Sequence, residues 1–468
     1  MKPAGLRRGV TALAAALGAA LWLSACSSVP TAATLAAPVP AAWQGAAAPH
    51  GAPVQSGWWS AFGDPVLDGL VQQALAHNTD LRASAARVAE ARALADVQHA
   101  AAWPTLDFGL GGQRSRSISA ATGKPYVANV LQPQFQAAYE VDLWGRVASL
   151  GQAADAQLRS SQDTRDSAAL SVAATTAASY INLRALDARL DVARQTLAAR
   201  QSALALARSR QQRGYSSELE TAQSEAEYRA TAQAIPQLEL AIVRQEHVLN
   251  LLTGAAPAPV PRGLPLVELE MSALPGTGLP SELLRRRPDL ASAEAQLAAT
   301  DAQLAAARAQ LLPSLHLGAT LGSISSTALS GDPFKLWSLG GSVLAPIFDG
   351  GRLQAQVRAS DARRDQALAG YEKAVLTAFS EVEDQLAAVG DLGRQGQEAE
   401  AQRVALQEAV RVATNRYREG YASYLDELDA QRNLFSAQQA ELQLRADRLA
   451  AQVGLYRALG GGWQPEAG

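Results

Sequence analysis

Apolar and polar residues follow two different periods along this 468-residue chain. A helical period extends from about Pro65 to Ala102 and over two much longer stretches, 147–212 and 352–418. At about 1.5 Å per residue each long stretch would measure about 100 Å, which is too long for a globular core. In the second stretch, spacings of three and four predict a coiled-coil seam. The seam comprises Leu368, Tyr371, Val375, Ala378, Val382, Leu386 and Val389.

Four shorter segments, two at about 105–141 and two at about 314–347, have a period of two. Phe135 and Leu317 lie on their apolar faces, whereas Gln136 and Thr320 lie on their polar faces. Such strands fit the wall of a membrane barrel, although they also fit an ordinary half-buried sheet. Four strands cannot enclose a channel, and lipid excludes an open sheet edge, so a membrane barrel would need several chains. Three copies would supply twelve strands, and the great length of the helices favours this membrane interpretation.

The same order of landmarks occurs twice, which predicts a two-fold internal repeat. Asp80-Leu81 matches Asp289-Leu290 at an offset of 209, and Gly145-Arg146 matches Gly351-Arg352 at an offset of 206. The repeats are assigned to residues 58–254 and 280–468, with a connector at 255–279. Each should contain a helix, two strands, a long helix, a turn and another helix. Gly214 and Gly420, the latter in a turn at about 416–425, are expected to form the tips of the two helical hairpins.

Several features predict interruptions of this regular pattern. Pro236 should kink or break its helix. The first helix of the second repeat should begin at Pro280, with Pro288 near its start, and end near Leu312. The connector contains a strand-like segment, 266–269, and is a candidate belt around the second long helix. Three glycines interrupt the seam of that helix, marking either a loosened turn or this belt: Gly390, Gly393 and Gly396.

The first 25 residues combine a basic head with a short apolar run, as in an export signal. The sequence then reads Leu23-Ser24-Ala25-Cys26, which resembles the lipobox of bacterial lipoproteins, in which the cysteine carries N-acyl and S-diacylglycerol chains. The alternative is ordinary cleavage that leaves an unmodified cysteine. Ser27, rather than Asp, follows and favours sorting to the outer membrane. Residues 26–57, rich in Ala and Pro, are expected to form a tether.

Charge and composition disfavour several classes of function. Without the three cations of the export signal, 41 − 3 = 38 basic residues face 44 acidic ones, so nucleic acid is not an expected partner. Cys26 is the only cysteine, and the five histidines are scattered, so we expect no metal site and no cofactor. No phosphate-binding loop, nucleophile elbow or catalytic triad stands out. The chain is therefore not expected to be an enzyme and has no candidate catalytic residue.

Three motifs resemble the TolC-like outer membrane factors, in particular the OprM/NodT-type efflux lipoproteins. They are Trp58-Trp59-x-x-Phe62-x-Asp64-Pro65, the tip sequence from Arg416 to Arg432, and Leu455-Tyr-Arg-Ala-Leu-Gly-Gly-Gly-Trp463. The resemblance implies an α+β, mostly helical membrane protein. A periplasmic helical barrel would continue into a trimeric twelve-stranded barrel in the outer membrane, with four strands from each chain. It also implies a tripartite efflux system containing a periplasmic adaptor and an inner-membrane transporter of the RND type, which exports drugs or other small toxic compounds.

Asp426 and Asp429 lie three residues apart and so share one face of the helix that follows the second tip. One explanation is purely structural: acidic side chains at the start of a helix are stabilised by the helix dipole. The resemblance implies instead an inward-facing carboxylate ring at a periplasmic gate, with Leu425 as an apolar plug, Arg432 as a charged partner and Tyr417 as a latch. It places Gly214 and Gly420 at the ends that an adaptor grips. No metal is assigned to the gate.

Two alternatives to a drug-efflux duct remain open at this point. A type I protein-secretion exit duct would have the same architecture. A non-conducting, lipid-anchored coiled-coil adaptor would fit the lipobox and the seam, but it would leave the four amphipathic strands unexplained. On the favoured interpretation the protein is lipid-anchored in the outer membrane and extends into the periplasm.

Overall fold

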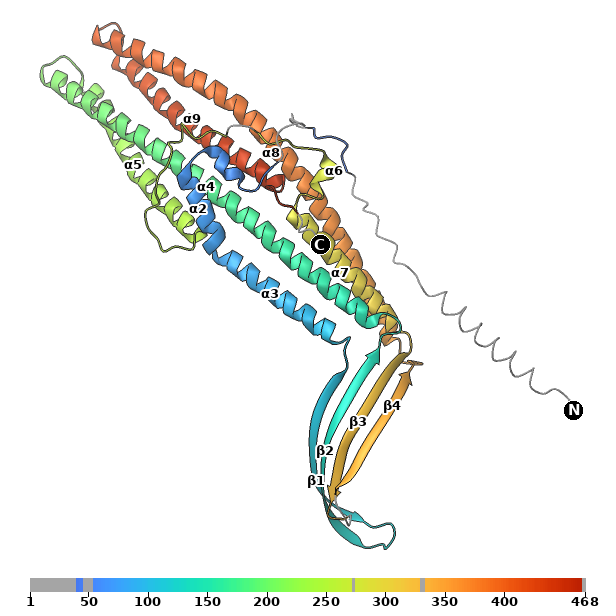
Figure 1. The fold of residues 1–468 in the computed structure, drawn as a ribbon. Helices are drawn as coiled ribbons and strands as arrows, with labels where there is room; N and C mark the ends of the chain where they lie inside the picture. Colours follow the sequence, from blue (N-terminus) through green and yellow to red (C-terminus); the bar gives the residue numbers. More distant parts are fainter. Residues whose placement is uncertain (1–38, 45–53, 272–273, 329–332, 465–468) are drawn as a thin grey trace. The chain divides into compact units, whose positions relative to one another are not determined.

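The computed structural model describes residues 39–44, 54–271, 274–328 and 333–464. In these residues a short 3-10 helix, η2 (Trp58–Phe62), precedes the α-helices and four strands drawn in Figure 1. The first set of elements is α2 (Pro65–His77), α3 (Thr79–Ala100), β1 (Thr105–Ile118), β2 (Pro125–Val141), α4 (Arg146–Gln212) and α5 (Glu218–Leu252). The second is α6 (Pro280–Leu283), α7 (Pro288–Ala309), β3 (Ser314–Ser326), β4 (Phe334–Leu344), α8 (Arg352–Arg418) and α9 (Tyr424–Ala458).

The two-fold repeat is confirmed by the lengths of the elements. The long helices α4 and α8 both contain 67 residues, and the hairpin partners α5 and α9 both contain 35. The helices before the strands, α3 and α7, both contain 22 residues. Each long helix leaves the sheet after a glycine with positive φ, Gly145 at 70° and Gly351 at 84°. The positive φ turns the chain from strand to helix without the steric cost that a Cβ would add.

The four strands form one antiparallel sheet in the order β1-β2-β3-β4, seen edge to edge in Figure 1. The register aligns residues of like polarity across all four strands. One row reads Phe108, Phe135, Leu321 and Trp337, and the adjacent row reads Asp107, Gln136, Thr320 and Ser338. Because neighbours in a row share one face of a sheet, the alternation assigned from the sequence produces one apolar and one polar face. The four strands contain between 11 and 17 residues, and β2 is the longest of them.

The core joins the start of the first repeat to both hairpins. Trp58 and Phe62 of η2 and apolar residues of α2 pack with buried residues of α4, α5 and α9. The indole of Trp58 stacks on the ring of Tyr456 with centroids 5.3 Å apart, so the opening and closing motifs of the sequence meet. The predicted seam of α8 is confirmed: Val375, Ala378, Val382 and Leu386 are buried, and the other three members are half-buried.

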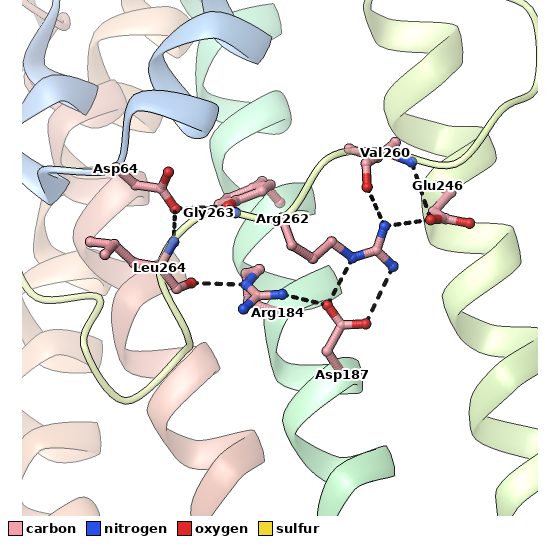
Figure 2. A network of polar contacts seen from close by, with 9 residues as sticks. Asp64, Arg184, Asp187, Glu246, Val260, Arg262, Gly263 and Leu264 are labelled. Carbon is pink, nitrogen blue, oxygen red and sulfur yellow. Dashed lines mark hydrogen bonds and ion pairs between the residues drawn. The ribbon is translucent and has the colours of Figure 1, made fainter.

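The connector is held against α4 and α5 by polar contacts, which Figure 2 shows from close by. Arg262 bonds to Asp187 of α4 at 3.0 Å and to Glu246 of α5 at 2.5 Å. The carboxylate of Asp64 is fully buried and accepts hydrogen bonds from the Leu264 amide and the Tyr180 hydroxyl. Burial raises the pKa of Tyr180, and its bond to Asp64 adds to the rise. These bonds fix the connector at the start of α2.

The expected strand at 266–269 is wrong. These residues form a turn in which the amide of Leu269 donates to the carbonyl of Pro265 at 3.2 Å, and Leu266 and Leu269 are buried in the core. No described strand lies beside this segment, so its backbone closes a local turn instead of joining a sheet.

The first helix of each repeat is broken where the sequence predicted a continuous one. At Asn78 the side-chain oxygen accepts from the amides of Asp80 and Leu81, while its side-chain nitrogen donates to the carbonyl of Leu252. This cap starts α3 as a separate helix. In the second repeat α6 has only four residues, because the ring of Pro288 disfavours helical geometry at Arg287, which is extended at φ −111° and ψ 122°.

Two other expected interruptions differ from the structure. Pro236 does not break α5, which is one helix of 35 residues. Helix α8 also continues through Gly390, Gly393 and Gly396, and a Cβ on any of them would meet open space within the described residues. The glycines therefore mark neither a break nor a site where the described connector packs. Trp43 lies instead about three to five turns nearer the sheet, with its ring 6.0 Å from that of Phe379.

Candidate gate at the helical hairpin tips

The two hairpin tips have the same backbone geometry. Gly214 and Gly420 have φ values of 77° and 78°, confirming the turn expected at each position. The amide of Tyr215 donates to the carbonyl of Arg210 at 2.9 Å, and that of Tyr421 donates to Arg416 at 2.8 Å. These bonds close the last turn of α4 and of α8, and a left-handed residue at this place favours glycine. Open space surrounds a Cβ at either glycine, so backbone conformation is what makes the residue necessary.

Tyr417, near the end of α8, reaches the first hairpin. Its hydroxyl donates to a carboxylate oxygen of Glu220 in α5, and its ring lies 5.1 Å from the guanidinium carbon of Arg210 in α4. Burial, with a further contribution from Glu220, raises the pKa of Tyr417 to about 12. The hydroxyl therefore stays protonated at neutral pH and can donate. The predicted latch tyrosine thus joins the two hairpins of one chain.

Arg432, in the third turn of α9, pairs with Glu227 of α5 at 2.5 Å. The same carboxylate pairs with Arg200 of α4 at 2.8 Å, and the side chains of Arg200 and Glu227 are only 7% and 11% exposed. Arg200 also donates to the carbonyl of Glu227 at 3.0 Å and lies 5.5 Å from the ring of Phe435. One buried carboxylate therefore holds a buried guanidinium from its own hairpin and a half-exposed one from the other hairpin.

The two aspartates do not have equivalent surroundings. The carboxylate of Asp426 turns back to the start of α9, where it accepts from the amide of Ser423 at 3.0 Å and from its hydroxyl at 2.9 Å. This is a capping box, so the helix-start explanation holds for Asp426 within one chain. Asp429 is 60% exposed and lies 3.6 Å from Arg432. Leu425 is 47% exposed and has no part in this polar network.

The structure thus joins Tyr417 and Arg432 separately to α5, with Asp429 beside Arg432, and leaves Leu425 and Asp426 outside these contacts. Sequence reasoning missed the parts that Glu220, Glu227 and Arg200 play in holding the tips. A signal for Arg200 existed in the periodic pattern. It lies on the buried stripe of α4 with Ala193, Leu204 and Ala207. A charged residue on an otherwise apolar stripe requires a buried partner.

The described residues contain no group of three or more His, Cys, Asp or Glu side chains that could hold a metal ion. Among the same residues no helix is both long and apolar enough to span a membrane. The chemistry that the tips offer is therefore ion pairing and hydrogen bonding between two hairpins. Such contacts can hold the ends of long helices together and can be broken one at a time.

Duplicated hairpins about 100 Å long, each continuous with two amphipathic strands, define a channel subunit that combines an outer-membrane sheet with a helical conduit. The chain belongs to the outer membrane efflux protein family, whose model matches residues 70–255 and 279–461. The two matched segments fall on the two repeats. Efflux across the outer membrane, expected from the resemblance, is thereby confirmed as the class of function, and this family is one of channels and not of enzymes.

Relatives with known roles support this assignment along nearly the whole chain. The pyoverdine export outer membrane protein OpmQ of Pseudomonas aeruginosa is 36% identical over 463 residues, covering 96% of this chain and 97% of its own. The solvent efflux pump outer membrane protein SrpC of Pseudomonas putida is 36% identical over 459 residues, with coverages of 95% and 97%. The open state of the Neisseria gonorrhoeae MtrE outer membrane channel is 30% identical with a TM-score of 0.83, and the match covers 95% of this chain and all of MtrE.

Proposed function

We propose that three copies of this chain form one continuous duct that serves as the outer-membrane outlet of a tripartite efflux pump. The observation that carries the proposal is the sheet. Its edge strands β1 and β4 each pair on one side only within the described chain, although one face of the sheet is apolar. In lipid, unpaired backbone groups of an edge strand cost several kcal/mol each, so the edges must pair with other copies.

The relatives favour small organic compounds as the exported substrates. OpmQ is named for pyoverdine export and SrpC for solvent efflux. We assign this chain to the same broad class, with a periplasmic adaptor that grips the tips at Gly214 and Gly420 and an inner-membrane transporter of the RND type. A protein-secretion duct has no observation in its favour here. A non-conducting adaptor is disfavoured because the relatives are outer membrane proteins.

The lipid anchor stays part of the proposal. Cys26 lies outside the described residues, and the case for its acylation rests on the lipobox-like sequence before it. Each buried CH₂ of an acyl chain contributes about 0.8 kcal/mol to membrane binding, so two or three chains would hold the N-terminus in the membrane.

The gate belongs to the proposal as well. Three copies of the second tip would bring Asp429 and Asp426 toward one axis, while Tyr417 and Arg432 hold that tip against the first hairpin of the same chain. Asp429 is the better placed carboxylate of the two, because the carboxylate of Asp426 already accepts two hydrogen bonds at the helix start. Leu425 would contribute the apolar constriction.

Oligomer mass and single-channel conductance of the purified protein in planar bilayers test the duct. We expect the mass of a trimer and discrete, cation-selective conductance steps. A stable monomer, or a trimer without conductance, would contradict the proposal. Export by cells that lack their own outer-membrane component, measured for small aromatic compounds and for a secreted protein, distinguishes the two kinds of duct.

The carboxylate ring is tested by Asp426→Asn/Asp429→Asn, which removes both charges while asparagine can still accept the hydrogen bonds of the helix start. We expect this double variant to lose cation selectivity and block by divalent cations. Glu419→Gln, which removes an exposed charge from the same tip, is the matched control. Unchanged selectivity in the double variant would exclude Asp426 and Asp429 from the gate.

A further inference from the structure

The outer end of the sheet carries basic residues that have no acidic partner among the described residues. Residues 108–139 contain Arg114, Arg116 and Lys124 but no Asp or Glu. Lys335 lies at the start of β4, at the same end of the sheet. All four side chains are exposed, and no described carboxylate lies within 4.0 Å of any of them. At the opposite end, where the helices begin, acidic groups are present and paired, as in Glu140–Arg146 at 2.7 Å.

Three of these cations lie on the apolar face of the sheet. Side chains alternate between faces along a strand, so residues separated by an even number share a face. Arg114 and Arg116 follow Leu110 by four and six residues on β1, and Lys335 precedes Trp337 by two residues on β4. Leu110 and Trp337 belong to the face that also carries Phe108 and Phe135. This face must contact lipid if the sheet lies in a membrane, because only apolar side chains are stable there.

The position of the cations along the strands matches the edge of a lipid bilayer. On β2 the lipid-side positions from Val141 to Leu131 are apolar or aromatic, and the next one, Asn129, is polar. Ten residues at about 3.4 Å span about 34 Å along the strand, and a tilt of about 40° reduces this to about 26 Å of height. An outer-membrane barrel has an apolar band of about 25 Å. Asn129 pairs with Arg114, and Val127 pairs with Arg116, so both guanidinium groups lie just beyond the band.

The hairpin turns lie at the end of the sheet far from the helices, which in an outer-membrane channel is the outer surface. We propose that Arg114, Arg116 and Lys335, together the outer basic girdle, bind phosphate groups of anionic lipids in the outer leaflet. Guanidinium groups suit this role because their planar donors match phosphate oxygens in a bidentate way. Long basic side chains at the margin of an apolar band can also extend toward the head groups while their stems stay in the hydrocarbon. A closed trimer would carry three such girdles around its circumference.

The proposal goes beyond efflux because it concerns how the channel is seated in its membrane. It makes the outer leaflet a specific partner, and it predicts that anionic lipid stabilises the closed barrel. Such binding acts by mass action on the assembled state, since a lipid that binds only the trimer favours it over separate chains. It also gives the cations of β1 and β4 a partner that the described residues do not supply.

The test uses the purified full-length trimer in detergent and native mass spectrometry with three probes. They are lipid A with two phosphates, its dephosphorylated form and phosphatidylethanolamine. We expect the wild-type trimer to retain bisphosphorylated lipid A in preference to the other two, with an affinity that falls as salt is raised. A basic residue near an anionic surface contributes about fivefold to binding, so Arg114→Gln/Arg116→Gln should bind lipid A about thirtyfold more weakly.

Two matched variants control this comparison. Arg229→Gln/Arg394→Gln removes two exposed guanidinium groups from the helical part, where the side chains are 70% and 79% exposed, and should leave lipid binding unchanged. Arg114→Lys/Arg116→Lys keeps both charges and should stay within about fivefold of wild type. If the glutamine variant does not assemble, the proposal is tested by the affinity of the lysine variant for lipid A and by the preference of the wild-type trimer for phosphorylated over dephosphorylated lipid A.

Three results would overturn the proposal. The first is equal wild-type affinity for phosphorylated and dephosphorylated lipid A. The second is that Arg114→Gln/Arg116→Gln binds lipid A as tightly as wild type. If this variant also changed the ion selectivity of the channel, the two arginines would lie in the lumen and not on the lipid side. The third is competition by millimolar inorganic phosphate as effective as that by lipid A, because the acyl chains would then contribute nothing.

Discussion

Replacing Glu227 by alanine should loosen both hairpin tips far more than replacing its half-exposed partner Arg432. Among the described residues, Glu227 is the single carboxylate paired with Arg200, whose side chain is 7% exposed. It also binds Arg432, whose side chain is 46% exposed. Burial lowers the pKa of Arg200, which indicates that its charge is poorly solvated. Removing one member of a buried ion pair costs about 3–5 kcal/mol, because the other charge remains buried without compensation.

Arg432→Ala is the informative comparison. It leaves the pair between Glu227 and Arg200 intact and removes a half-exposed contact, which contributes about 1 kcal/mol or less. Glu227→Ala should therefore increase the equilibrium constant for local opening of the tips by more than about a hundredfold, whereas Arg432→Ala should increase it about fivefold. Hydrogen exchange of the amides at the start of α5 and α9 in the purified trimer measures this opening directly.

Two further variants test the cause. Glu225→Ala removes an exposed carboxylate from the same helix, which pairs with Arg208 and Arg229, and should leave exchange at the tips almost unchanged. Arg200→Met/Glu227→Leu replaces both buried charges by apolar groups and should restore much of the protection that Glu227→Ala loses. The reasoning fails if Glu227→Ala and Glu225→Ala have equal effects, or if the double replacement is no better protected than Glu227→Ala.

Three other outcomes are expected. The raised pKa of Tyr417, about 12, means that its neutral hydroxyl contributes stability fully below the unfolded value of about 10 and loses it as pH rises toward 12. The conductance of the wild-type channel should therefore rise between about pH 10 and pH 12. The Tyr417→Phe channel should already conduct more than wild type at neutral pH, and its conductance should not change as the pH is raised further. If the conductance of both channels depended on pH in the same way, the Tyr417 hydroxyl would have no part in closing the gate. Phe135→Arg on the apolar face should cost about 2–4 kcal/mol near the bilayer midplane and reduce the yield of trimer, while Gln136→Arg on the polar face should be tolerated, and equal yields would mean that the faces are reversed. Cys26→Ser with an ordinary export signal should still reach the outer membrane and retain partial export in fractionation and efflux assays, since the barrel also holds the membrane; complete release into the soluble periplasm would contradict the barrel.

The repeat, the two long helices, the polarity of the strand faces and the glycine tips were all predicted correctly from the amino-acid sequence. Each of these features depends on spacing within one segment, such as the period of two around Phe135 or the seam through Val375. The motifs near Trp58 and Arg432 were specific enough to identify the family and with it the class of function. The register across the sheet was not predicted, because one apolar face excludes shifts by an odd number of residues but does not by itself place Phe108 beside Phe135.

The contacts that hold the tips, and the positions where the helices break, depend on residues that are far apart in the sequence. Tyr417 meets Glu220 across 197 residues of sequence, and Arg432 meets Glu227 across 205. Asn78 lies between two helices, and its side-chain amide donates to the carbonyl of Leu252, which is 174 residues away in the sequence. Local propensity contains no information about such partners. A buried charge, or the free backbone groups at a helix break, are stable only where a distant segment provides a hydrogen-bond partner. Whether such a partner is present depends on how the two hairpins pack against each other.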